Sequence, residues 1–120
     1  MTIPGMKTRR VDPDIDIVEL IGTLRLGSTL SWIEADIRRM IGEGSRKLII
    51  DVSQLRYTDS AGIGLFITMN GAMEQAGGRM RIAGASGEVA KSFSIVHIDR
   101  VILMDSSIEA ACDSFASAGS

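Results

Sequence analysis

The stretch YTDSAGIG, from Tyr57 to Gly64, decides how this sequence of 120 residues folds. It joins LIIDV (Leu48–Val52), an apolar run typical of a buried strand, to LFITMNGAMEQA (Leu65–Ala76), which has helical spacing. Gly62 and Gly64 fall in the first turn of this helix, although glycine costs about 1 kcal/mol relative to alanine in a helix interior. The stretch therefore predicts a strand, a loop and a helix whose start is unusually bare.

Asp59 and Ser60 stand at the predicted start of this helix. The carboxylate of Asp59 can cap the helix by accepting a hydrogen bond from the backbone N–H of Ala61 or Gly62. Ser60 would then be the first helical residue, where free N–H groups and about half a positive charge tolerate a phosphate. Two interpretations stay open on these residues alone. Either this is only a cap with glycines that allow tight internal packing, or the bare turn lets another protein approach Ser60.

Working outward from this unit, apolar spacing predicts strands and helices in alternation. The predicted strands are Met6–Val11, Ile15–Leu24, Arg46–Val52, Arg79–Gly84 and Val101–Met104, with a turn at Asp12–Asp14 between the first two. The predicted helices are Ser28–Gly44, the run from Ser60 to the Gly77-Gly78 pair, Ser86–Val96 and Ile108–Phe115. The predicted caps are Ser28 or Ser31 (with Glu34), Asp59, Ser86, and Ser106 (with Glu109).

This order predicts an α/β fold with a mixed sheet of four to five strands flanked by about four helices. The length favours one domain over residues 1–120, with a core at about 15–116, a short N-terminal strand and a C-terminal tail that frays. Within Ile15–Leu24, alternation places Val18, Leu20, Gly22 and Leu24 on one face and Ile17 and Ile21 on the other.

Composition excludes several function classes. A net charge of -2 and 4% aromatic residues speak against nucleic-acid binding. No run approaches the roughly 18 apolar residues of a membrane span, and the start lacks the apolar core of a signal peptide, so a cytoplasmic location is expected.

Cys112 is the only cysteine and is expected in the core, and His97 is the only histidine. No Walker motif occurs, so the sequence predicts no nucleotide site, and a zinc site needs more than one histidine. The sequence therefore predicts no cofactor and no metal.

Two runs carry a family resemblance: IIDVSQLRYTDSAGIGLF, and MEQAGGRMRIAGASGEVAKSFSIVHIDRVILMDSSIEAA. Together they resemble the STAS domain of anti-sigma factor antagonists, from about Val18 to Phe115. The resemblance implies that Ser60 is phosphorylated by an anti-sigma factor that is itself a serine kinase. The unphosphorylated domain would bind this anti-sigma factor and free a sigma factor, and a serine phosphatase would reset it. The predicted partner-binding residues are Thr58, Asp59, Ser60, Ala61, Gly62, Ile63 and Gly64, together with Arg25.

The sequence departs from the family pattern at two places. Family members often carry an acid where GTLRLGS (Gly22–Ser28) has Arg25, which could pair with a phosphate on Ser60, change the choice of partner, or simply be a solvated arginine. Many relatives have glycine where His97 stands. Histidine tolerates a positive φ better than most residues, so we interpret His97 as a helix terminator.

Other functions compete with the phosphorylated antagonist. A STAS domain that is never phosphorylated would serve as a scaffold subunit of a stress-sensing complex or as a partner of a transporter. An enzyme with Ser60 as nucleophile lacks the G-x-S-x-G elbow, and only His97 could act as its base. A receiver domain with Asp51 as phosphoacceptor lacks the acidic pair and the lysine that it needs, so Asp51 is expected to order the following turn. The oligomeric state stays open.

Overall fold

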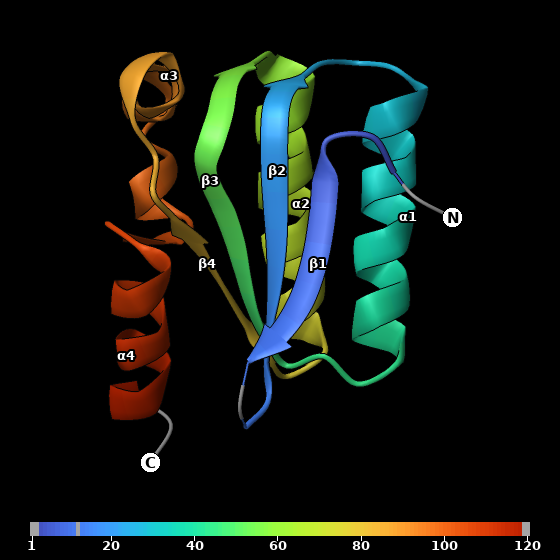
Figure 1. Cartoon of the computed structure of the whole chain (residues 1–120), viewed down its shortest axis with the longest axis vertical. Coiled ribbons are helices and arrows are strands. Elements are labelled where there is room, and N and C mark those ends of the chain that lie inside the picture. The colour runs from blue at the N-terminus through green and yellow to red at the C-terminus, as the bar shows by residue number, and fades with distance from the viewer. Residues whose placement is uncertain (1–2, 12, 119–120) are drawn as a thin grey trace.

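The computed structural model describes residues 3–11 and 13–118, and shows a five-stranded sheet with helices on both of its faces (Figure 1). Asp12 of the predicted turn, and residues 119–120 of the predicted fraying tail, lie outside this part. The elements, in chain order, are β1 (Met6–Val11), β2 (Ile15–Leu24), α1 (Ser28–Gly42), β3 (Lys47–Thr58), α2 (Ser60–Gln75), β4 (Arg79–Ala83), α3 (Gly87–Val96), the 3-10 helix η1 (Ile98–Arg100), β5 (Leu103–Asp105) and α4 (Ile108–Ala118).

The strands follow one another across the sheet in the order β1-β2-β3-β4-β5. Strand β1 is antiparallel to β2, and the remaining neighbours are parallel. Parallel strands need a crossover connection, which α1, α2 and α3 supply. The predicted single α/β domain with a mixed sheet and four helices is confirmed.

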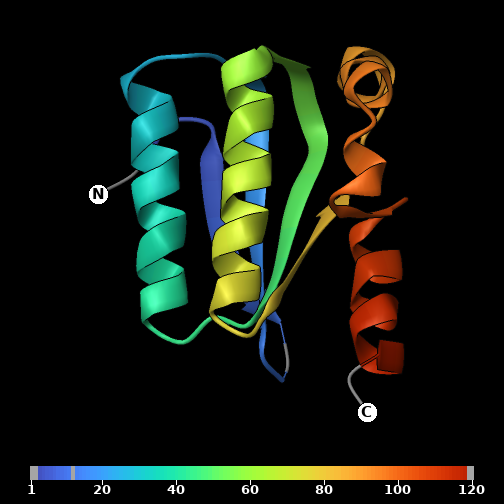
Figure 2. The ribbon, with the colours of Figure 1, turned by 180° about the vertical axis from the view of Figure 1, so that it is seen from behind.

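The two faces of the sheet carry separate parts of the core. On one face, Val18 and Leu20 of β2 pack in a cluster with side chains of α1, α2 and α3, and α1 and α2 lie side by side over it (Figure 2). On the other face, Ile17 and Ile49 pack with Ala111 and Phe115 of α4. The alternation predicted for β2 is confirmed, because neighbouring residues of the strand belong to different clusters.

Strand β3 is longer than predicted. The sequence predicts an end at Val52, whereas the strand continues to Thr58 beside β2. Register shifts between Glu19 and Ile21, and between Gly22 and Thr23, interrupt the ladder. An irregularity of this kind breaks the alternation of apolar and polar side chains. The sequence of residues 53–58 therefore lacks the alternation that would predict a strand. The extension carries the chain as far as Asp59.

Several predicted boundaries and caps are wrong. Helix α1 ends at Gly42 and begins after Gly27, with no side-chain cap from either predicted serine. The last helix is capped by Ser107 in place of Ser106, since the backbone N–H of Ala110 donates to the Ser107 hydroxyl at 3.0 Å. The last strand is Leu103–Asp105, two residues later than its predicted start. Serine occurs at both 106 and 107, and glycine at both 42 and 44, so the sequence did not distinguish between these positions.

The prediction for His97 is confirmed. His97 ends α3 with φ 55° and ψ 44°, the left-handed conformation expected of a helix terminator. Met69 and Met73 of α2 are buried, as are Phe66 and Phe93, whose rings meet edge to face with centroids 5.6 Å apart. Cys112 packs partly buried against the α4 cluster, and burial raises the pKa of its thiol.

Candidate interaction site

The candidate site lies where β2 and β3 end and α2 begins. The register pairs Thr23 with Tyr57 and Leu24 with Thr58, so the two strands stop together. Figure 2 shows the loop from β2 to α1 at the same end of the molecule as the start of α2. This is the carboxyl end of parallel strands, where α/β proteins commonly bind their ligands.

Asp59 ties this end of the molecule together. One carboxylate oxygen, Oδ1, accepts from the N–H of Gly62 at 3.0 Å, which is the predicted helix cap. The other, Oδ2, accepts from the N–H of Leu26 at 2.9 Å, and the N–H of Asp59 donates to the carbonyl of Leu24 at 3.0 Å. Hydrogen bonds from the backbone of Leu26 and Gly62 hold the pKa of Asp59 below its ordinary value, with a smaller contribution from the positive charge of Arg25. The carboxylate therefore fixes both the helix start and the β2–α1 loop.

Ser60 is the first residue of α2, and its side chain is exposed. Gly64, one turn later, is also exposed, and a side chain added there would meet nothing within 4 Å. Ala61 and Ile63 are half-buried and pack against the core cluster. The exposed part of the predicted stretch is thus a narrow strip along one side of the first turn.

Two of the predicted contact residues are buried. Thr58 is 3% exposed, and its hydroxyl donates to the carbonyl of Asp59 at 3.1 Å. A Cβ on Gly62 would overlap the hydroxyl of Thr58 and lie 3.0 Å from Cδ2 of Leu24. For Gly62, tight internal packing is therefore the correct interpretation of the glycine. Thr58 and Gly62 are therefore buried residues that support the exposed strip and are not part of its surface.

Arg25 lies beside the helix start. Its guanidinium carbon is 4.3 Å from the centroid of the Tyr57 ring, which is a cation–π contact. Next to it, Leu26 is 80% exposed, and Tyr57 is 38% exposed. Sequence reasoning missed Leu26 and Tyr57 as site residues. Leu26 follows Leu24 at the two-residue spacing of a strand. From the sequence it therefore looks like one more buried strand residue, although it is exposed.

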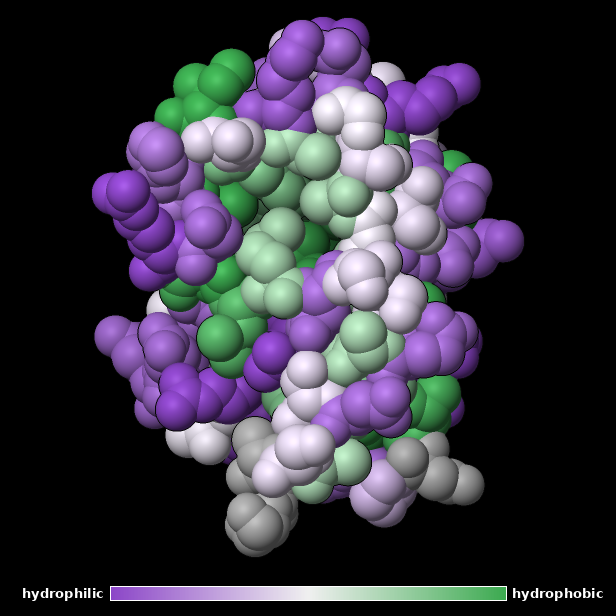
Figure 3. Space-filling view, turned by 90° about the vertical axis from the view of Figure 1, so that its left-hand side faces the viewer, coloured by the Kyte–Doolittle hydropathy of each residue, from purple (hydrophilic) through white to green (hydrophobic). Residues whose placement is uncertain are grey.

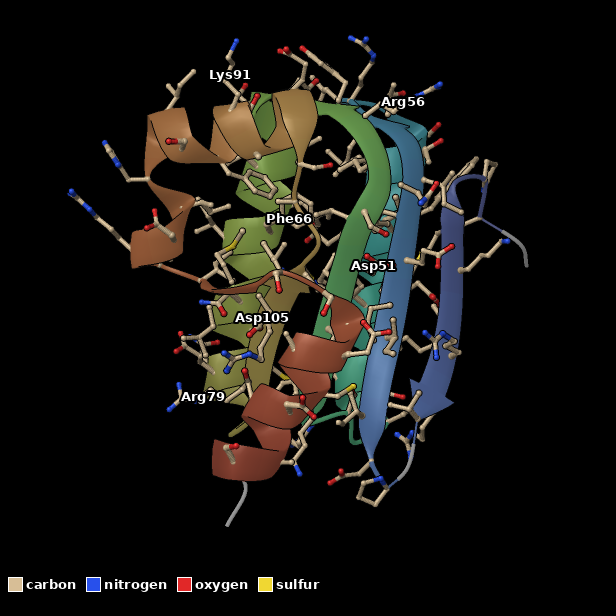
Figure 4. The ribbon with its side chains drawn as sticks, turned by 60° about the vertical axis from the view of Figure 1, so that its left-hand side comes forward. Asp51, Arg56, Phe66, Arg79, Lys91 and Asp105 are labelled. Carbon is tan, nitrogen blue, oxygen red and sulfur yellow. The ribbon has the colours of Figure 1, made fainter. Side chains whose placement is uncertain are left out.

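A hollow of about 480 Å³ lies between the last part of β3 and the start of α3. Its lining includes Ser53, Arg56 and Glu88, and Figure 4 shows Arg56 and Lys91 at this end of the molecule. Buried Asp51 lies nearby in β3 and accepts from the N–H of Ser53 at 3.0 Å. The turn-ordering role predicted for Asp51 is wrong, because no turn follows it and β3 continues to Thr58. Within residues 3–11 and 13–118, no group of three or more His, Cys, Asp or Glu side chains could hold a metal ion.

Hydrophobic residues gather on the side of the molecule formed by α3, η1 and α4 (Figure 3). A hollow of about 270 Å³ there is lined mainly by apolar residues, among them Phe93, Ile98 and Met104. It is separate from the strip that carries Ser60. In the part of the chain that the structure describes, no helix is long and apolar enough to cross a membrane.

The family model of the STAS domain matches residues 7–111 of this chain. The fold is similar to that of TM1081 from Thermotoga maritima, at 17% identity over 91% of this chain and 92% of that chain, with a TM-score of 0.83.

It is also similar to the Bacillus cell fate determinant SpoIIAA in its phosphorylated form, at 24% identity over 91% and 97% of the two chains, with a TM-score of 0.72. A chain in the structure of the stressosome, a signal integration and transduction hub, is 19% identical over 94% and 98% of the two chains, with a TM-score of 0.70. Because the family model of the STAS domain matches residues 7–111, which is most of the chain, this chain belongs to the STAS domain family.

Proposed function

We propose that this chain is an anti-sigma factor antagonist switched by phosphorylation of Ser60. The unphosphorylated form binds an anti-sigma factor kinase in the cytoplasm and releases a sigma factor. The kinase transfers the terminal phosphoryl group of a bound nucleoside triphosphate to Oγ of Ser60, and a serine phosphatase removes it. This chain is then a substrate and a ligand, and it catalyses nothing itself. The observation that carries the proposal is the exposed Ser60 hydroxyl at a helix start held rigid by Asp59.

The switch needs no change of fold. Phosphorylation adds about -1.5 to -2 charges and three strong acceptors to the surface. If Ser60 lies at the centre of an interface, the phosphate must be desolvated or must face acidic groups of the partner. A loss of about 3 kcal/mol in this way would weaken binding about 100-fold. The exposed strip from Ser60 to Gly64, with Arg25, Leu26 and Tyr57 beside it, is the surface we assign to the partner.

A second candidate function is that of a scaffold subunit that is not phosphorylated. The likeness to a chain of the stressosome favours this candidate, because that structure is a large assembly named as a signal hub. The same exposed strip would then be a permanent contact, and a negative charge on Ser60 would have no regulatory role.

The test is affinity capture from a lysate of the native cells with three baits: the wild type, Ser60→Ala and Ser60→Asp. We expect a kinase to be retained by the wild type and by Ser60→Ala, and to be lost with Ser60→Asp. Ser31→Asp is the matched control, since Ser31 is an exposed serine in the first turn of α1. It should retain the kinase. Mass spectrometry of the chain from the same cells should find phosphate on Ser60.

Equal retention of the same proteins by all baits, with no phosphate on Ser60, would contradict the switch and favour the scaffold function. Loss with both aspartate variants would mean that any added charge at this end of the molecule weakens binding, and would remove the special role of Ser60.

A further inference from the structure

The backbone at Arg25 is held beside Asp59 by hydrogen bonds on both of its sides. The carbonyl of Leu24 accepts from the N–H of Asp59 at 3.0 Å, and the N–H of Leu26 donates to the Asp59 carboxylate at 2.9 Å. Neighbouring strands lie about 4.8 Å apart, so Arg25 starts its long side chain close to Asp59 and to the following Ser60. The position of Arg25 relative to the helix start is thus a fixed property of the fold.

The guanidinium of Arg25 lies over the ring of Tyr57, and it is not among the arginine donors of side-chain hydrogen bonds in the part of the chain that the structure describes. Among the salt bridges of residues 3–11 and 13–118, none involves Arg25. A guanidinium can stack through its face while its planar fork of N–H groups binds an oxyanion. Tyr57 therefore orients the cation and does not consume its donors.

The start of α2 offers few donors of its own to an anion on Ser60. The carboxylate of Asp59 already accepts from the N–H of Gly62, and the N–H of Ala61 also contributes to lowering the pKa of that carboxyl. A phosphate on Ser60 would lie next to this carboxylate and be repelled by it. It needs a cation close by, and the positive charge of Arg25 already acts on the neighbouring carboxyl of Asp59, whose pKa it helps to lower.

We propose that Arg25 is the internal ligand of a phosphate on Ser60. The inference rests on the proposed function and adds a second half to the switch. Phosphorylation would place negative charge on the helix start and would also withdraw the cation of Arg25 from the surface offered to a partner. The partner that fits the unphosphorylated surface then presents a carboxylate to Arg25 and an apolar group to Leu26, which is 80% exposed.

The experiment uses the full chain with phosphoserine installed genetically at position 60, and follows its phosphorus-31 NMR shift through a pH titration. The second pKa of phosphoserine is about 6, and a nearby cation lowers it because it favours the dianion. We expect this pKa to be about half a pH unit higher in Arg25→Gln than in the wild-type background, the size of an exposed ion pair. Arg25→Lys, which keeps the charge but not the fork, should show a smaller rise.

Arg56→Gln is the matched control, because Arg56 is an exposed arginine of β3, next to Tyr57 in sequence, and should leave the phosphoserine pKa unchanged. An equal pKa in the wild type and Arg25→Gln would overturn the proposal, and so would an equal rise in Arg25→Gln and Arg56→Gln. The titration needs no kinase. If Ser60 is never phosphorylated in cells, the proposed function fails while the pKa difference stands, and if the pKa values are equal, the ligand role fails while the capture experiment is unaffected.

Discussion

At the scale of single residues, Asp59 makes the stability of the fold depend on pH. Its carboxylate accepts backbone hydrogen bonds that lower its pKa in the folded state. A group with a lowered folded pKa contributes stability above its unfolded pKa of about 3.9, and loses this contribution as the pH falls toward the folded value. We expect Asp59→Ala to lower the urea midpoint clearly at neutral pH and only slightly near pH 3. Urea unfolding of both proteins across this range is the measurement.

Asp59→Asn is the control for this prediction, because asparagine caps helices as well as aspartate does but does not titrate in this range. It should retain most of the stability at neutral pH and lack the pH-dependent part. A difference between the wild type and Asp59→Ala that stays constant with pH would show that the ionised carboxylate has no special role.

At the scale of elements, the two glycines near the start of α2 should respond to substitution in opposite directions. Gly62→Ala should destabilise the domain by about 1–3 kcal/mol through overpacking, since its methyl group would press on Thr58 and Leu24. Gly64→Ala is the matched control in the same helix, where the space is open, and it should stabilise by about 0.5–1 kcal/mol through helix propensity. Chemical denaturation of both variants measures the pair, and equal effects would mean that the close packing around Gly62 relaxes freely.

The same helix start shows what sequence alone could predict. The cap at Asp59 follows from residue type and position, because aspartate is a preferred capping residue directly before an apolar helix. The burial of Gly62 does not follow, since it depends on Leu24 of a strand that is distant in sequence. The contact between Arg25 and Tyr57 was hidden for the same reason, because it requires the extension of β3 past an irregular ladder.

At the scale of the whole molecule, helix α4 covers the face of the sheet opposite α1 and α2, and one polar cluster holds it there. Arg81 of β4 forms an ion pair with Asp105 of β5 at 2.6 Å, with side-chain exposures of 15% and 8%. The hydroxyl of Ser114 in α4 donates to the same aspartate at 2.9 Å. The guanidinium also lies 5.7 Å from the ring centroid of Phe115. The cluster joins two strands and the last helix.

Breaking this cluster should loosen α4 and leave the Ser60 strip intact. Asp105→Ala leaves the half-buried Arg81 without its partner, so we expect a loss of about 1–3 kcal/mol in the free energy of unfolding. Hydrogen exchange should speed up in α4 and stay slow in α2. Helix α2 packs on the other face of the sheet, and its start is capped by Asp59. Glu34→Ala removes the exposed pair with Arg38 in α1 and should cost only about 0.3–0.5 kcal/mol. Faster exchange in α2 as well would show that the two faces unfold together, and α4 would then support the helix start that carries Ser60.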